Sequence, residues 1–229
     1  MRCLLLFALT LTLTFTACAP EPAPVETETT ESTTMAELPD ITLQGNRFAP
    51  LTWDEMTDAQ KTMTTNILAG PRTAMGGPFN VLLRSPEMGD MAQALGAYAR
   101  FNSSLPGKLR EMSIIMAARF WMAQFEWNAH KRAALAEGLD PAIVDAIATG
   151  QRPANMDADE TVIYDFVDEM LNDKRVSDES FAAAIDSLGE RGVVDVIGTV
   201  GYYSMVSLLL NVDEYPLGEG VEPELQPLD

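Results

Sequence analysis

Apolar residues recur three and four positions apart through most of the chain after residue 40, which is the spacing of amphipathic helices. Start and stop signals divide this pattern into segments. Ser or Asp before Pro, or three residues before Glu, marks several starts, and Gly marks several ends. The pattern predicts helices at 54–68, 85–101, 106–138 and 140–150, another beginning at 157, and two more at 177–188 and 190–211. We therefore expect an all-α fold, with residues 40–215 forming one domain that has a sizeable core.

The segment 190–211 is the most apolar part of this domain. Its β-branched residues are common in strands, but about twenty residues pass without a turn signal, which favours a helix. The apolar positions include Val193, Val194, Ile197, Val200 and 208–210. We expect this helix to be deeply buried or to form an interface between subunits.

The first residues have the pattern of an export signal. Arg2 supplies positive charge, and the apolar run 3–15 is too short to span a membrane. The run continues into Thr-Ala-Cys18, which resembles the lipobox of bacterial lipoproteins, although Phe15 stands where Leu is usual. We predict a lipoprotein signal peptide over 1–17 and a lipid on Cys18, which would hold the protein in the cell envelope facing the periplasm. Cleavage by a general signal peptidase would instead release a soluble exported protein.

Two segments flank the predicted domain. Residues 18–39 are mostly Pro, Glu, Thr and Ser, and this composition cannot bury enough apolar surface to become ordered. We interpret them as a disordered acidic tether between the lipid and the domain. Residues 216–229 are acidic and rich in proline, which predicts an extended arm or a disordered tail.

Charge and cysteine content exclude several functions. The net charge of −19 becomes −20 once Arg2 is removed with the signal, and such a surface repels nucleic acid and anionic lipid. We therefore expect no nucleic-acid partner, and membrane attachment only through a lipid anchor. No cysteine follows Cys18, so the domain has no thiolate nucleophile, disulfide or cysteine zinc site.

The only histidine, His130, lies four residues after Glu126. On a helix this spacing places both side chains on one face, where the carboxylate can fix the tautomer of the imidazole or raise its basicity. An ordinary exposed pair on an acidic helix has the same spacing and contributes little stability. Aromatic neighbours such as Phe125 and Trp127 favour the buried alternative, in which a charged pair needs partners.

Glu111 is a further candidate, but spacing alone does not bring it to this pair. On one straight helix it would lie about 22 Å from Glu126. No Gly or Pro marks a break between the two positions.

A family resemblance changes this expectation. The runs LREMSII at 109–115, ARFW at 118–121 and QFEW at 124–127, with His130 after them, resemble the carboxymuconolactone decarboxylase family of the alkylhydroperoxidase D-like superfamily. The resemblance extends from about Arg47 to Pro216. It implies an all-α alkylhydroperoxidase D-like bundle with a turn near 121–123, which would return Glu111 to His130. It also implies self-association, as a homo-trimer or hexamer.

The same resemblance separates two chemistries. The peroxidase branch has two cysteines between the Glu and the His, and here those positions hold Ala123 and Glu126, so thiol peroxidase chemistry is excluded. The remaining set resembles the cysteine-less decarboxylase branch. It implies His130 as general acid or base, Glu126 as the group that orients or tunes it, and Glu111 as a second proton-transfer or positioning group. A decarboxylase, or an isomerase or hydrolase of a related lactone, would use such groups.

The expected substrate is a small lactone or other carboxylate, which needs a cation in the site. Arg119 is the first candidate and Arg72 the alternative, because a guanidinium fork matches a carboxylate. A structural ion pair is the competing explanation for Arg119. Trp127 and Tyr202 are further candidates for substrate contact, and core packing is the other interpretation of such aromatic residues.

Two alternatives remain open. Glu126, His130 and a returned Glu111 could ligate a metal, but one His without cysteines is a weak ligand set, and we expect no metal and no cofactor. A protein of another class, a non-catalytic small-molecule binding or assembly protein of the envelope, would hold an apolar carboxylate without turnover. Its adaptable pocket could be lined by some of the thirteen methionines, although core packing explains them as well.

Overall fold

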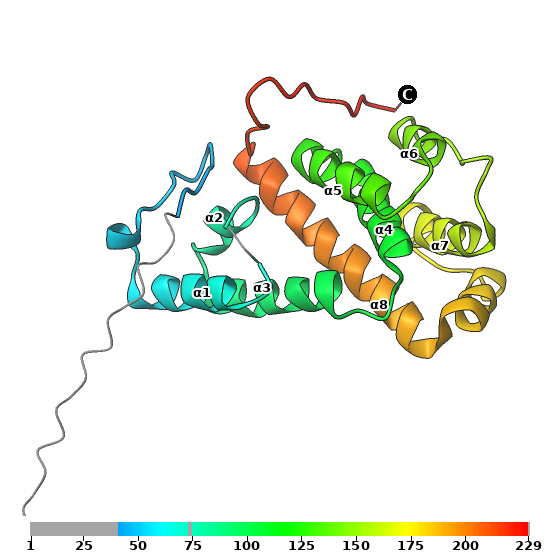
Figure 1. Ribbon diagram of the computed structural model, residues 1–229, viewed down its shortest axis with the longest axis horizontal. Helices are drawn as coiled ribbons and strands as arrows, with labels where there is room; N and C mark the ends of the chain where they lie inside the picture. The colour runs from blue at the N-terminus through cyan, green and yellow to red at the C-terminus, as the bar shows by residue number, and fades with distance from the viewer. Residues whose placement is uncertain (1–40, 73–74, 229) are drawn as a thin grey trace, which may run out of the picture. The chain divides into compact units, whose positions relative to one another are not determined.

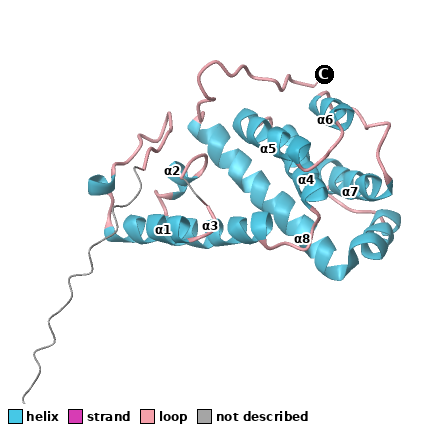
Figure 2. Ribbon diagram, in the orientation of Figure 1, coloured by secondary structure: helices cyan, strands magenta, loops and turns pink. Residues whose placement is uncertain are grey.

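The computed structural model describes residues 41–72 and 75–228 (Figures 1 and 2). Within these ranges every regular element is helical, which confirms the all-α prediction. The signal peptide, Cys18 and the tether lie outside the described residues. The elements are η1 (Trp53–Glu55), α1 (Asp58–Ala69), α2 (Phe79–Leu82), α3 (Pro86–Phe101), α4 (Gly107–Phe120), α5 (Gln124–Ala136), α6 (Pro141–Ala148), α7 (Ala158–Asp168), η2 (Glu169–Asp173) and α8 (Asp178–Asp213).

Side-chain caps begin α6, α7 and α8 where the sequence predicts them. Asp157 and Glu160 form the expected capping box of α7, and the Ser177 hydroxyl accepts the Ser180 N–H at the start of α8. The predicted helix at 54–68 is an exception. Thr57 forms a capping box with Gln60, so α1 begins at Asp58 and the preceding residues form the separate turn η1.

The predicted continuous helix over 106–138 is interrupted. α4 ends at Phe120 and α5 begins at Gln124, with Met122 between them in the left-handed region at φ 55°. The Asn211 amide donates to the Trp121 carbonyl at 2.6 Å and ties this turn to α8. The turn therefore lies where the family resemblance implies it, and residues without glycine flexibility adopt it.

α4 lies at the centre of the larger hydrophobic core. Nearly all of its residues from Leu109 to Arg119 are buried, and it packs against α5, α6, α7 and α8. A smaller core joins α1, α2 and the beginning of α3. Because α4 has neighbours on several sides, the polar residues along it must point into cavities or find partners.

Two helical segments make up α8, as predicted, because Gly189 interrupts the helical backbone at φ 68°. The longer segment buries Val193 and Val200 but exposes Val194 and Ile197, so one apolar face packs inside and another faces out. By length and composition alone α8 could cross a membrane. However, 56% of its most apolar window is buried within the protein, as in an ordinary core helix.

The C-terminal arm, residues 217–228, is an ordered extended segment that packs on α5 (Figure 1). Leu225 is buried in the larger core, and Glu224 accepts hydrogen bonds from the Trp127 indole at 3.1 Å and the Lys131 ammonium at 2.6 Å. Of the two forms expected for this tail, the structure has the extended arm.

Candidate functional site

Glu111, Glu126 and His130 meet inside the domain. The turn between α4 and α5 folds the second helix back along the first, so Glu111 faces His130 across nineteen residues of sequence. The His130 Nδ1 lies 2.6 Å from Glu111 Oε2, and its Nε2 lies 3.1 Å from Glu126 Oε2. The imidazole is therefore held between two carboxylates, one at each nitrogen.

All three side chains are buried, with 3% to 5% of each residue exposed. Burial lowers the pKa of His130, but its contacts with Glu111 and Glu126 outweigh this effect and raise the pKa to about 9. Burial raises the pKa of Glu111, but the hydrogen bond and charge of His130 outweigh it, and the net shift is downward. At neutral pH the site therefore contains an imidazolium ion. Because Glu126 and His130 are buried, they are not the ordinary exposed pair that the same spacing also allowed.

Tyr203 of α8 completes the surroundings of the imidazole. Its ring meets the His130 ring edge to face at 4.7 Å, and Tyr202 packs against Tyr203 at 5.2 Å. Burial raises the pKa of Tyr203 well above its ordinary value, so this hydroxyl stays protonated. The carboxylates contact the two ring nitrogens, and the aromatic contact with Tyr203 adds a further restraint on the orientation of the imidazole.

A cavity of about 440 Å³, here called the histidine cavity, opens in front of this set. Glu126 and His130 form part of its wall, whereas Glu111 lies behind the imidazole and away from the cavity. Other wall residues that matter below come from the loop before α2 and from α3 and α8; they are Arg72, Gly77, Arg100 and Tyr202.

Arg72 and Arg100 are the cations of the histidine cavity, and neither has an ion-pair partner among the described residues. The Arg72 guanidinium lies over the Phe79 ring at 5.0 Å, and its Nε and Nη2 are buried without a hydrogen-bond partner in the described part of the chain. A buried guanidinium nitrogen without a partner is costly. The arrangement is suited to an incoming anion.

Gly77 leaves space in front of Glu126. Its φ of +61° favours glycine, and a Cβ there would lie 3.1 Å from Phe125 and 3.9 Å from Glu126 Oε1. The Gly77 N–H donates to the Tyr215 hydroxyl at 3.0 Å, which holds the loop in this position. One carboxylate oxygen of Glu126 thus contacts His130, while the other faces the Gly77 side of the cavity.

The structure places two expected substrate-binding residues away from the histidine cavity. Arg119 lies near the end of α4 and lines a different cavity, so it is not the cation of this site. Trp127 is 1% exposed and gives its indole N–H to Glu224 of the C-terminal arm, so its role is packing. Tyr202 does line the histidine cavity, and Arg72, the alternative cation, lies there too.

Sequence reasoning missed Gly77 and Arg100. Neither has a fixed spacing from the pair on α5, because one lies in a loop and the other on α3. The Gly76-Gly77-Pro78 sequence is a turn signal that could have indicated a close approach of the backbone.

The geometry does not favour a metal ion in this site. The two carboxylates contact opposite nitrogens of one ring, so the three groups cannot converge on a common point. Among the residues with assigned positions, no group of three or more His, Cys, Asp or Glu side chains is arranged to hold an ion.

No family model matches the sequence, and no curated protein matches it.

Proposed function

We propose that the protein is an acid–base enzyme acting on a small carboxylate, with an unsaturated lactone carboxylate as the substrate class that the resemblance suggests. The observation that carries this proposal is the buried His130 imidazole between two carboxylates, beside a cavity with two arginines that have no carboxylate partner among residues 41–72 and 75–228. Decarboxylation, isomerisation and hydrolysis of such a lactone all require proton transfer by a positioned group.

The two contacts of His130 support different roles for the two carboxylates. The shorter contact, at 2.6 Å, joins Nδ1 to Glu111, which lies behind the ring and fixes its orientation. The longer contact joins Nε2 to Glu126 on the cavity wall. Glu111 is therefore the positioning residue, and His130 with Glu126 is the pair that exchanges a proton with the substrate.

In a decarboxylation the bond between the ring carbon and its carboxylate breaks, CO2 leaves, and the electron pair moves into the unsaturated lactone. The carbon then takes a proton, and the His130 imidazolium is the donor, with Glu126 able to relay it. An isomerase would use the same groups to remove a proton from one carbon and return it to another. The raised pKa of His130, about 9, keeps the donor protonated at neutral pH.

The arginines supply what an acidic protein otherwise lacks. With a net charge of −19 the chain repels anions at long range, so an anionic substrate needs local cations. Arg72 lines the cavity from the loop before α2 and Arg100 from α3, and the buried Arg72 nitrogens, which have no partner in the described part of the chain, offer charge-assisted hydrogen bonds.

Location and assembly form part of the same proposal. We place the protein in the cell envelope through a lipid on Cys18, and as a homo-oligomer, a trimer or a hexamer. Exposed apolar side chains on α3 and α8 support self-association, since such surfaces are frequently interfaces. They include Met88, Met91, Leu95, Val194, Ile197 and Val212.

Deuterium incorporation tests the proposal. The full chain carrying Cys18→Ser, which prevents lipidation and avoids detergent, is incubated in D2O with unsaturated lactone carboxylates and followed by NMR. An active protein transfers solvent deuterium to a substrate carbon, and the fate of the carboxylate signal separates decarboxylation from isomerisation. His130→Gln should lower the rate by about 10²–10⁴-fold.

Glu160→Gln is the matched control, because Glu160 is as buried as His130 but caps α7, a role that Gln also fulfils. Its rate should equal that of the parent. Unchanged turnover in His130→Gln would remove the proposed role of the histidine. Lactone binding without product or deuterium exchange would instead assign the protein to the non-catalytic binding class.

A further inference from the structure

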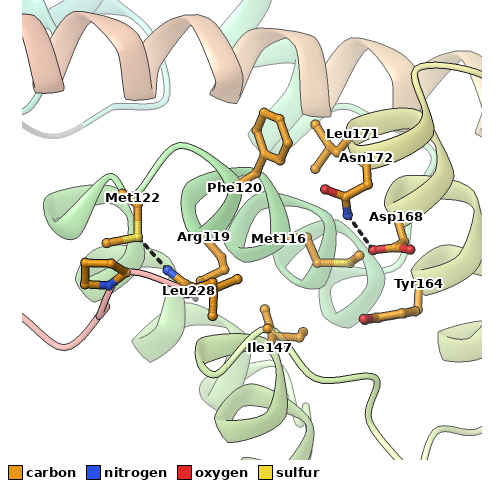
Figure 3. Close-up of a pocket in the computed structure, with 12 residues that line it drawn as sticks. Met116, Arg119, Phe120, Met122, Ile147, Tyr164, Asp168, Leu171, Asn172 and Leu228 are labelled. Carbon is orange, nitrogen blue, oxygen red and sulfur yellow. Dashed lines mark hydrogen bonds between the residues drawn. The ribbon is translucent and has the colours of Figure 1, made fainter.

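A second cavity of about 440 Å³, here called the arginine cavity, lies beside the C-terminal half of α4, where Met116, Arg119 and Phe120 line it (Figure 3). Its walls come from α4, α6, α7, η2 and the C-terminal arm, and it shares no lining residue with the histidine cavity. Most of the wall is apolar, with Met116, Phe120, Ile147, Leu171 and Leu228 as its main side chains. This volume is in the range of small-molecule sites.

Arg119 is the cation in this apolar wall. Only 6% of the residue is exposed, and burial lowers the pKa of its guanidinium. Its Nη2 donates to the Gln226 carbonyl at 2.8 Å, its Nη1 contacts the Met122 sulfur, which is a weak acceptor, and its Nε has no hydrogen-bond partner in the described residues. No carboxylate of the described chain lies within ion-pair distance of it.

A buried positive charge without a counter-charge is expensive for a folded protein. Among the residues that the structure describes, one carbonyl and one thioether accept from Arg119, so its guanidinium is satisfied only in part. A carboxylate entering the cavity would complete the hydrogen bonds of the guanidinium and neutralise its charge.

The other polar groups of the arginine cavity lie at the far end. Asp168 accepts a hydrogen bond from the Asn172 amide at 2.7 Å, and Tyr164 lies beside them. Figure 3 shows Arg119 and this Asp168 group on opposite sides of Met116. The negative charge of Asp168 repels a carboxylate, so the two ends together would orient a ligand in one direction.

We propose that the arginine cavity binds a small apolar carboxylate, with its carboxylate on Arg119 and its hydrocarbon part among Met116, Ile147 and Leu171. The site is separate from the proposed acid–base site and needs none of its residues. The C-terminal arm belongs to it, because Gln226 holds the guanidinium and Leu228 forms part of the wall.

Methyl NMR with octanoate as the probe tests this site. In the full chain carrying Cys18→Ser and labelled at its methionine methyl groups, Met116 and Met122 report the arginine cavity, whereas Met63 lies in the smaller core and serves as a control. Octanoate, added up to about 10 mM, should shift the Met116 and Met122 signals saturably and leave Met63 unchanged. Octanol, which has the same chain without the charge, should bind at least about tenfold more weakly.

Variants separate the contributions of charge and shape. Arg119→Gln should lower octanoate affinity to the level of octanol and leave octanol affinity unchanged, whereas Ile147→Phe should weaken both by filling the apolar part. If Arg119→Gln does not fold, the ratio of octanoate to octanol affinity in the parent protein decides. Absence of shifts at Met116 and Met122, equal affinity for the two probes in the parent, or unchanged octanoate affinity in a folded Arg119→Gln protein would each overturn the proposal.

Discussion

The two cavities have the same volume, about 440 Å³, and each contains an arginine with buried guanidinium nitrogens, yet their chemistry differs. The histidine cavity places its cations beside an imidazole and a carboxylate that can exchange protons. In the arginine cavity the one carboxylate among the described lining residues, Asp168, lies at the far end, across an apolar floor. α4 contributes to both regions, because Glu111 contacts His130, whereas Arg119, about 12 Å further along the helix axis, lines the arginine cavity. One helix can thus serve a proton-transfer site and an anion-binding site, because its polar residues face different neighbours.

The largest expected effect concerns pH and is confined to the histidine cavity. The folded pKa of His130 is about 9, against an ordinary value of 6.5, so the folded state keeps a proton that the unfolded chain loses in this window. The free energy of unfolding should therefore be highest below about pH 6.5 and fall as pH rises to about 9, by on the order of 3 kcal/mol. Urea unfolding at a series of pH values measures this slope.

His130→Gln is the control for that measurement, and its slope between pH 6.5 and 9 should be nearly flat. The chain has one histidine and no thiol after Cys18, so few other groups titrate in this window. At low pH the sign reverses. The lowered pKa of Glu111 stabilises the protein above its ordinary value of 4.5, and this stabilisation is lost as pH falls. A parent slope equal to that of His130→Gln would show that the imidazole is not held by the carboxylates.

The C-terminal arm offers the next largest effect, and of the two cavities compared it lines only the arginine cavity. Leu225 is 2% exposed, and Leu225→Ala should lower the free energy of unfolding by about 2 kcal/mol. The loosened arm should also weaken octanoate binding, while the His130 ring signals keep their pKa. If the pKa of His130 shifts when octanoate binding weakens, the two cavities are coupled through α5.

The sequence predicted the features of this comparison that depend on local signals. The capping residues Asp157 and Ser177 start their helices as expected, and the spacing of Glu126 and His130 places them in contact. The break at Met122 has no local signal, since its left-handed backbone is stabilised by tertiary contacts such as that from Asn211. Only the family resemblance implied this turn.

Local sequence patterns do not determine which arginines line the histidine cavity. Helical spacing fixes the side of α4 on which Arg119 lies, but not which helices pack against that side. Because α6, α7 and the arm pack beside Arg119, this residue lines the arginine cavity and not the histidine cavity. Gly77 and Arg100 join the site from 49 and 26 residues before Glu126 in the sequence, and no spacing rule connects them.

Replacing one arginine of each cavity in turn tests whether the two cavities are separate sites. Arg72→Met should raise the KM for an anionic substrate at the histidine cavity by about tenfold or more, because a buried charge-assisted hydrogen bond is lost. It should leave octanoate binding at Met116 and Met122 unchanged. Arg119→Met should have the opposite pattern. If either variant affects both readouts equally, one ligand site would replace the two proposed here.

Gly77→Ala gives the smallest expected effect and tests the shape of the histidine cavity without removing any charge. The residue has a φ of +61°, which costs an L side chain about 1 kcal/mol, and the new Cβ would lie 3.1 Å from Phe125. Because that atom would also lie 3.9 Å from Glu126 Oε1, the space in front of the carboxylate narrows. We expect a small loss of thermal stability, a larger relative loss of turnover in the deuterium assay, and unchanged octanoate binding.

Gly198→Ala is the matched control, since a Cβ at Gly198 meets no atom within 4 Å and the residue lies in helix α8. Equal turnover in the two variants would mean that the substrate does not approach Glu126 from the Gly77 side. The substrate would then have to receive its proton directly from His130.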